Sequence, residues 1–234
     1  MASGWFITGT DTGVGKTLVS RLLLEALQRA GHSAVGMKPV ASGCHVSAAG
    51  LRSDDALELM RAGGAAADYA DVNPYALASA CAPHIAAREM AVEIRLEKIL
   101  ESFRRLQQQS PWVVVEGVGG WSVPLGERLT MAEVARALGL PVILVVGLRL
   151  GCLNHALLTA QAIRCADIPL AGWVANRIDP AMTHVPENIA TLAQKIEAPL
   201  LAQIPYQSAA QPDAAGAMFP VAEMIMRFNQ DEGA

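Results

Sequence analysis

The sequence predicts an α/β fold built on one doubly wound, mainly parallel sheet with helices on both faces. Short apolar segments alternate with segments whose apolar residues recur at helical spacing. Residues 112–115 and 142–146 lack the alternation expected of a half-exposed strand. Continuous apolar strands are typical of a parallel sheet that is buried on both sides. No repeat or linker-like stretch divides the sequence, so we expect residues 1–234 to form one domain.

The individual elements follow from local patterns along the chain. Strands are expected at residues 5–8, 33–37, 112–115, 142–146, 170–175 and 200–204, and helices at 16–30, 53–61, 94–106, 130–139, 154–166 and 187–196. Ser53 is a typical N-cap residue, and Thr130 with Glu133 has the spacing of a capping box. We expect residues 65–88 to be irregular, because Asn73-Pro74 and Ala82-Pro83 interrupt regular structure.

Composition and charge exclude several classes of protein. With 52% apolar and 17% charged residues, the chain is not intrinsically disordered. A net charge of −4 argues against nucleic-acid or polybasic membrane partners. The most membrane-like uncharged stretch, residues 137–148, is shorter than the roughly 20 residues that span a bilayer, and no signal peptide is apparent. The four cysteines form no Cys-x-x-Cys pair, so we expect free thiols rather than a zinc site or disulfides.

The strongest motif lies between the first strand and the first helix. The segment Gly9-Thr-Asp-Thr-Gly-Val-Gly-Lys-Thr17 has the composition of a phosphate-binding loop of the P-loop NTPase type. Backbone N–H groups of Gly13, Val14 and Gly15 would face phosphate oxygens at a helix N-terminus. Lys16 would reach the β- and γ-phosphates, and the Thr17 hydroxyl would bind Mg²⁺. The loop departs from the strict pattern, since five residues rather than four separate Gly9 from the Gly15-Lys16 pair.

Polar residues also follow the other predicted strands. Lys38 ends the second strand, which we expect beside the strand that precedes the loop, and Glu116 ends the third. In open α/β sheets, ligands bind outside the carboxyl ends of the strands. Only four of the 18 basic residues are lysines, which makes Lys16 and Lys38 notable. Glu116 and Thr17 together favour an Mg²⁺ site, whereas Asp55 could be either a ligand or an acid at a helix start.

An ordered set of segments resembles the dethiobiotin synthetase family from about residue 4 to residue 206. The matching segments are 9–17, Lys38-Pro-Val-Ala-Ser-Gly43, Ser53-Asp-Asp-Ala56, Asn73-Pro-Tyr75, Val115-Glu-Gly-Val-Gly-Gly-Trp121, Gly147-Leu-Arg-Leu-Gly-Cys-Leu-Asn-His155 and Gly172-Trp-Val-Ala-Asn176. The family's own loop spacing accounts for the extra residue after Gly9.

The resemblance implies a cytoplasmic homodimer that converts 7,8-diaminopelargonate, CO₂ and ATP into dethiobiotin, ADP and phosphate with Mg²⁺. It assigns Mg²⁺ to Thr17, Asp55 and Glu116. It gives Lys38 a catalytic role toward a carbamate and the γ-phosphate, beside Lys16.

The same resemblance implies further contacts at matching positions. ATP would also meet Gly119, and its adenine would lie near Asn176-Arg177 and Pro205-Tyr206. The substrate would contact Thr12 and Ser42. The turn of Gly151, Cys152, Leu153 and Asn154 would receive the substrate carboxylate from the other subunit's site.

Two alternatives share parts of this pattern. An ATPase switch of the ParA/MinD type would have the same loop, but such proteins usually carry a second lysine early in the loop. Residues 9–14 contain no lysine, and residues 217–234 do not form a basic amphipathic pattern that would bind a membrane surface. An amide synthase of the cobyrinate type would need a glutaminase domain and a longer chain.

Overall fold

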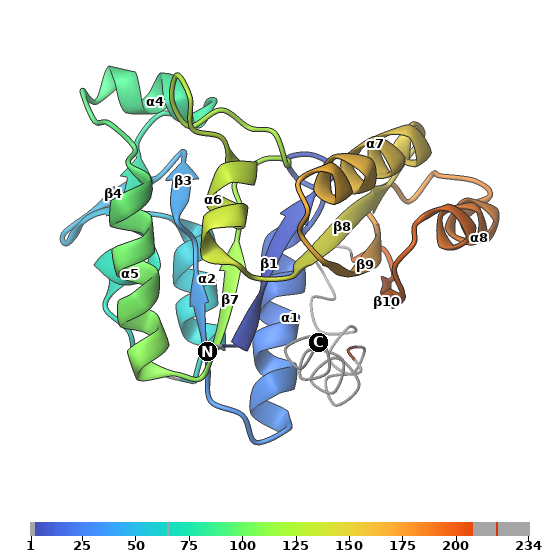
Figure 1. Cartoon of the computed structure of the whole chain (residues 1–234), viewed down its shortest axis with the longest axis horizontal. Helices are drawn as coiled ribbons and strands as arrows, with labels where there is room; N and C mark the ends of the chain where they lie inside the picture. Colours follow the sequence, from blue (N-terminus) through green and yellow to red (C-terminus); the bar gives the residue numbers. More distant parts are fainter. Residues whose placement is uncertain (1–2, 65, 208–218, 220–234) are drawn as a thin grey trace.

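The computed structural model describes residues 3–64, 66–207 and 219, and it is centred on a six-stranded parallel sheet (Figure 1). The strands, in chain order, are β1 (Ser3–Gly9), β2 (Ala34–Met37), β7 (Trp112–Glu116), β8 (Val142–Leu148), β9 (Leu170–Arg177) and β10 (Leu200–Ile204). They lie in the order β10-β9-β8-β1-β7-β2. Every residue of β7 and β8 is buried, as their continuous apolar sequences predicted. The predicted α/β fold class is confirmed.

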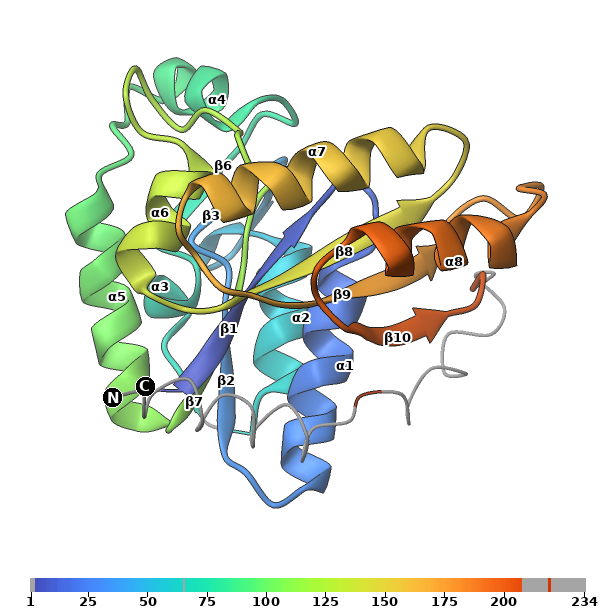
Figure 2. The same ribbon diagram turned by 45° about the vertical axis from the view of Figure 1, so that its right-hand side comes forward.

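Helices cover both faces of the sheet (Figure 2). One face carries α1 (Lys16–Arg29) and α2 (Asp54–Ala62), and the other carries α5 (Leu96–Gln109), α6 (Met131–Leu138), α7 (Cys152–Cys165) and α8 (Val185–Lys195). Leu22, Leu23 and Leu27 of α1 are buried in the same apolar cluster as Ile7 of β1. Each such side chain stabilises the fold by about 1.5–3 kcal/mol. Within the described part of the chain, no helix has the length and apolarity needed to cross a bilayer.

Side-chain caps fix the starts of two helices where the sequence predicted them. The Ser53 side chain accepts a hydrogen bond from the N–H of Ala56 at the start of α2. At α6, the Thr130 side chain accepts from the N–H of Glu133, and the Glu133 carboxylate accepts from the N–H of Thr130. Gly139 then ends α6 in the left-handed conformation, with φ of 67°. These local interactions satisfy backbone groups that a helix end leaves unpaired.

The expectation that residues 65–88 are irregular is wrong for about half of this segment, of which residue 65 lies outside the described residues. The structure places α3 (Tyr69–Val72), β6 (Tyr75–Leu77) and α4 (Pro83–Glu89) there. The strand β6 exists because it pairs with β3 (Val40–Ser42), and a separate hairpin joins β4 (His45–Ser47) to β5 (Gly50–Arg52). Pro83 starts α4 rather than breaking structure, since a missing N–H is tolerated in the first turn of a helix.

The expected neighbour of the second strand also needs correction. We expected the strand that ends at Lys38 to lie beside β1, but β7 lies between β1 and β2. The chain leaves β1, forms the edge strand β2, and later inserts β7 between them. Sequence order alone does not specify that insertion. The insertion of β7 places Glu116, at the end of that strand, in contact with both Thr17 and Lys38.

Candidate active site

The phosphate loop connects β1 to α1 and has a backbone shape that glycine makes possible. Gly13 and Gly15 have φ of 74° and 92°, a region that other residues rarely adopt. A Cβ atom at Gly15 would lie 2.1 Å from Nδ2 of Asn176. That amide is buried and donates a 2.8 Å hydrogen bond to the carbonyl of Val14. Asn176, near the end of β9, therefore holds the backbone of the loop through this hydrogen bond.

Lys16 is buried at the start of α1, and its ammonium points back into the loop. It donates a 2.9 Å hydrogen bond to the carbonyl of Asp11. Burial and the positive charge of Lys38 together lower the pKa of Lys16 to about 8, although nearby carboxylates partly oppose this shift. A bound phosphate would give the Lys16 ammonium an anionic acceptor in place of the neutral Asp11 carbonyl.

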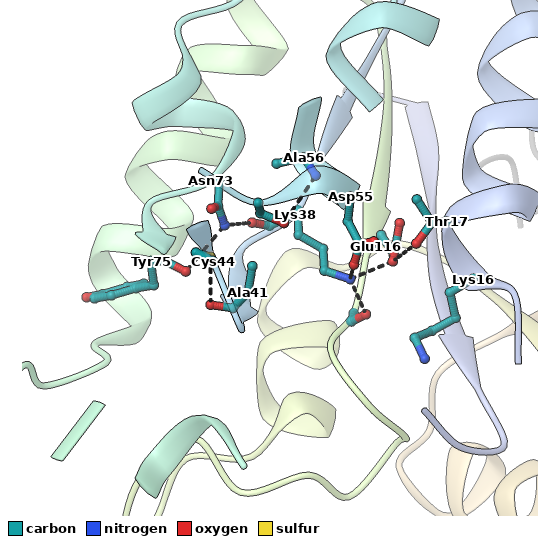
Figure 3. A network of polar contacts seen from close by, with 12 residues as sticks. Lys16, Thr17, Lys38, Ala41, Cys44, Asp55, Ala56, Asn73, Tyr75 and Glu116 are labelled. Carbon is teal, nitrogen blue, oxygen red and sulfur yellow. Dashed lines mark hydrogen bonds and ion pairs between the residues drawn. The ribbon is translucent and has the colours of Figure 1, made fainter. Parts of the chain in front are cut away.

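A compact cluster of charged groups lies beside the loop (Figure 3). The buried ammonium of Lys38 lies 2.5 Å from Oε1 of Glu116 and 2.7 Å from Oδ2 of Asp55. The Thr17 hydroxyl donates to the same Glu116 oxygen at 2.9 Å. These four residues come from the ends of β2 and β7 and from the first turns of α1 and α2. Thr17, Asp55 and Glu116, which were predicted to share one site, thus lie together. The Lys38 ammonium contacts the carboxylates of Asp55 and Glu116.

The electrostatics of this cluster keep Lys38 positively charged. Burial by itself would lower its pKa, but the carboxylates of Glu116 and Asp55 raise it above the usual lysine value. Burial would raise the pKa of Asp55, but Lys38 and the Thr17 hydroxyl hold it below its ordinary value. Both groups are therefore ionised near neutral pH. Among the described residues, the buried Oε2 of Glu116 has no hydrogen-bond partner. A free anionic oxygen beside a hydroxyl and a second carboxylate suits a hard cation such as Mg²⁺.

A cavity of about 780 Å³ opens onto the loop and the cluster. Of the residues expected from the sequence, ten line it: Thr12, Gly13, Gly15, Lys16, Thr17, Lys38, Ser42, Asp55, Glu116 and Gly119. The Ser42 hydroxyl is buried and has no hydrogen-bond partner among the described residues. Its oxygen is therefore available to a polar group of a ligand. The cavity's volume is in the usual range for sites that bind small molecules.

Other expected residues lie outside this cavity lining. Val14 is buried beneath the loop, and Asn176 supports it as described above. The Arg177 guanidinium donates to the carbonyls of Asp179 and Pro180 instead. Pro205 and Tyr206 are exposed just after β10. The turn of Gly151, Cys152, Leu153 and Asn154 starts α7 and does not line the cavity of its own chain.

Sequence reasoning missed most of the apolar wall of the cavity. This lining includes Ala80, Cys81, Ala82 and Pro83, then Val118, Val123 and Pro124, and Ala41 of β3. Such small apolar residues carry no distinctive signal in a sequence. Ala41 and Val118 do lie within segments that carry the family resemblance, but no role was assigned to them there.

Comparisons with known proteins identify the family of this chain. A family model described as AAA domain matches residues 3–214. The ATP-dependent dethiobiotin synthetase BioD of Xanthomonas oryzae pv. oryzae is 50% identical over 213 residues, which are 91% of this chain and 93% of that protein. The protein of the same name from Aromatoleum aromaticum is 51% identical over 208 residues, or 89% and 92% of the two chains.

A solved structure with a similar fold belongs to a different kind of protein. The septum site-determining protein MinD of Pyrococcus horikoshii aligns with a TM-score of 0.55 over 88% of this chain and 82% of its own, at 17% identity. An identity this low establishes the shared fold only. Because the matches at about half identity span nine-tenths of the sequence, the chain belongs to the ATP-dependent dethiobiotin synthetase family of enzymes.

Proposed function

We propose that this chain catalyses the ATP-dependent closure of a cyclic urea on 7,8-diaminopelargonate with CO₂, giving dethiobiotin, ADP and phosphate. The observation that carries the proposal is the cluster of Lys38, Asp55, Glu116 and Thr17 at the base of a cavity beside the phosphate loop. Phosphoryl transfer needs positioning and charge more than a covalent nucleophile. The cluster supplies both.

Mg²⁺ would be held by Thr17, Asp55 and Glu116. The fit rests on the unpartnered Oε2 of Glu116 and on the Thr17 hydroxyl 2.9 Å from the other oxygen of that carboxylate. Mg²⁺ prefers one or two protein carboxylates together with phosphate oxygens and water. When bound, the ion would neutralise charge on the β- and γ-phosphates of ATP, alongside Lys16.

Lys38 is the proposed catalytic cation. One substrate amine adds to the carbon of CO₂ and loses a proton, which gives a carbamate. A carbamate oxygen then attacks the γ-phosphorus, and ADP leaves. The second amine attacks the carbonyl carbon of the resulting carbamic–phosphoric anhydride, and phosphate leaves as the ring closes. The fixed ammonium of Lys38 would stabilise the charge on the carbamate and the transferring phosphoryl group, where a preorganised cation is most effective.

The remaining residues would bind the two substrates. Val14 and its neighbours in the loop would present N–H groups to the phosphates of ATP. Thr12 and the unpartnered Ser42 hydroxyl would contact the diamine, and the apolar wall at Ala80–Pro83 would face its alkyl chain. Gly119, and Asn176-Arg177 with Pro205-Tyr206 at the end of the sheet, would lie toward the nucleotide.

We also propose that the enzyme is a cytoplasmic homodimer in which each chain acts as one ATP-binding domain. The Gly151–Asn154 turn would serve the partner's cavity, which is compatible with its position outside the cavity of its own chain. Leu150 beside this turn is 96% exposed and Leu158 of α7 is 57% exposed. In the proposed dimer, the partner would cover these two side chains. An ATPase switch of the MinD type is not favoured, because the likeness to MinD extends only to the fold.

The direct test is incorporation of labelled bicarbonate into 7,8-diaminopelargonate in the presence of ATP and Mg²⁺. We expect ring closure by the purified chain, and a turnover at least about a hundredfold lower for Lys38→Gln. ATP affinity, measured by calorimetry, should change little. Lys38→Arg should also be poor, because a forked guanidinium does not fit where an ammonium contacts two carboxylates. Absence of incorporation, or near-normal turnover by Lys38→Gln, would refute the proposal.

A further inference from the structure

The backbone of Lys38 is held by the last residue of α3 and the residue that follows it. The buried amide of Asn73 donates to the Lys38 carbonyl at 2.6 Å and to the Tyr75 carbonyl at 3.3 Å (Figure 3). The Lys38 N–H donates to the carbonyl of Val72 at 2.8 Å. Since β2 ends at Met37, the sheet does not supply these bonds. Both peptide groups of Lys38 are therefore fixed by one short segment that is distant in sequence.

The same segment also holds the start of α2. The Tyr69 hydroxyl donates to Oδ1 of Asn73 at 2.9 Å and accepts from the N–H of Ser53 at 2.7 Å. Ser53 is the N-cap of α2, and Asp55 lies in the first turn of that helix. One chain of hydrogen bonds thus runs from the backbone of Lys38, through Asn73 and Tyr69, to the cap of the helix that carries Asp55.

The residues at the two ends of this series of hydrogen bonds also contact each other through their side chains. The Lys38 ammonium and the Asp55 carboxylate are 2.7 Å apart. The lysine side chain is long and flexible, so its ammonium is placed by its backbone anchor together with the acids that it contacts. Hydrogen-bond networks of this kind can fix a geometry more firmly than single bonds do. A displacement of a reacting group by about 1 Å can lower the reaction rate about a hundredfold.

We propose that Tyr69 and Asn73 are positioning residues for Lys38: they fix its backbone and the helix start that carries its partner Asp55, without touching substrate. The inference rests on the catalytic role proposed above for Lys38. It extends that role to a polar pair outside the cavity lining, which contributes to turnover by aligning a charge rather than by binding ATP or the diamine.

The first experiment removes one hydroxyl and uses a matched control. Tyr69→Phe deletes the group that joins Ser53 to Asn73, whereas Tyr75→Phe deletes a hydroxyl that accepts from the N–H of Arg95 at 2.9 Å. We expect kcat to fall about tenfold for Tyr69→Phe, with the KM for ATP changed less than about threefold. Tyr75→Phe should keep its kcat, even if both variants lose similar stability in urea. Equal kcat values for the two variants would overturn the inference.

The second experiment asks whether the effect passes through Lys38. In a Lys38→Gln background, Tyr69→Phe should lower kcat by less than about twofold, because the charge that it positions is gone. Asn73→Asp keeps an acceptor for Tyr69 but loses the donor to the Lys38 carbonyl. It should also lower kcat in the wild-type background and by less than about twofold in the Lys38→Gln background. A full tenfold loss in the Gln background would mean a general structural role and refute the inference. Normal turnover by Lys38→Gln alone would instead refute the proposed function.

Discussion

Raising the pH from about 7 to 9 is expected to weaken ATP binding, because Lys16 then loses its proton. In the absence of nucleotide, burial and the nearby positive charge of Lys38 lower the pKa of Lys16 to about 8. A phosphate anion beside the ammonium would raise that pKa again. Binding above about pH 8 must therefore take up a proton, and the affinity falls as the proton becomes harder to obtain.

The expected size follows from the fraction of Lys16 that is charged. With a pKa of about 8, roughly nine-tenths of it carries the proton at pH 7 and roughly one-tenth at pH 9. ATP affinity should therefore fall about tenfold over this range, or about 1.4 kcal/mol. Folding has its own pH dependence. The charge on Lys16 opposes folding near neutral pH, and this cost is relieved as pH rises from about 8 toward the ordinary lysine pKa of 10.5.

Calorimetry without the diamine measures this binding with no turnover. Titrations in two buffers of different ionisation enthalpy give the number of protons taken up at each pH. The matched control is Lys16→Arg, whose guanidinium stays charged throughout the range and should give an affinity that does not depend on pH. Lys38 does not produce the effect, since the two carboxylates that it contacts raise its pKa.

Two results would refute this reasoning. One is a wild-type affinity that stays constant between about pH 7 and 9, with no proton uptake. The other is an Arg variant that loses affinity with the same slope as the wild type, which would assign the proton to another group.

Three further predictions concern the metal, the fold and the dimer. Glu116→Gln should raise the half-saturating Mg²⁺ concentration at least about tenfold at fixed ATP, and an unchanged midpoint would remove Glu116 from the metal site. Thr130→Ala should lower the free energy of unfolding in urea by about 1 kcal/mol through loss of the α6 cap, with kcat unchanged. Co-refolded mixtures of Lys16→Ala and Gly151→Val chains should regain activity in heterodimers, since both mutations would then fall in the same one of the two sites and leave the other site intact. Inactive heterodimers would contradict a shared site.

The sequence alone determined the features that depend on neighbouring residues. The glycines and the Lys16-Thr17 pair identify the phosphate loop, because its shape is formed by consecutive residues. The caps of α2 and α6 depend on residues within one helical turn, and the continuous apolar run at Val142–Val146 identifies a buried strand. For the same reason, α2 and α6 start and end within one residue of the predicted positions.

Only the tertiary structure decided how distant segments meet. Nothing local to Trp112–Glu116 specifies that this strand inserts between β1 and β2, yet that insertion brings Glu116 within 2.5 Å of Lys38. The strand β6 is stabilised by pairing with β3 rather than by its own sequence, so the local pattern at Tyr75–Leu77 does not indicate a strand. Asn73 could be recognised as part of a familiar motif, but its bond to the Lys38 carbonyl joins residues 35 positions apart. Such contacts form because the fold buries polar groups that must then be paired, and that pairing is a property of the assembled chain.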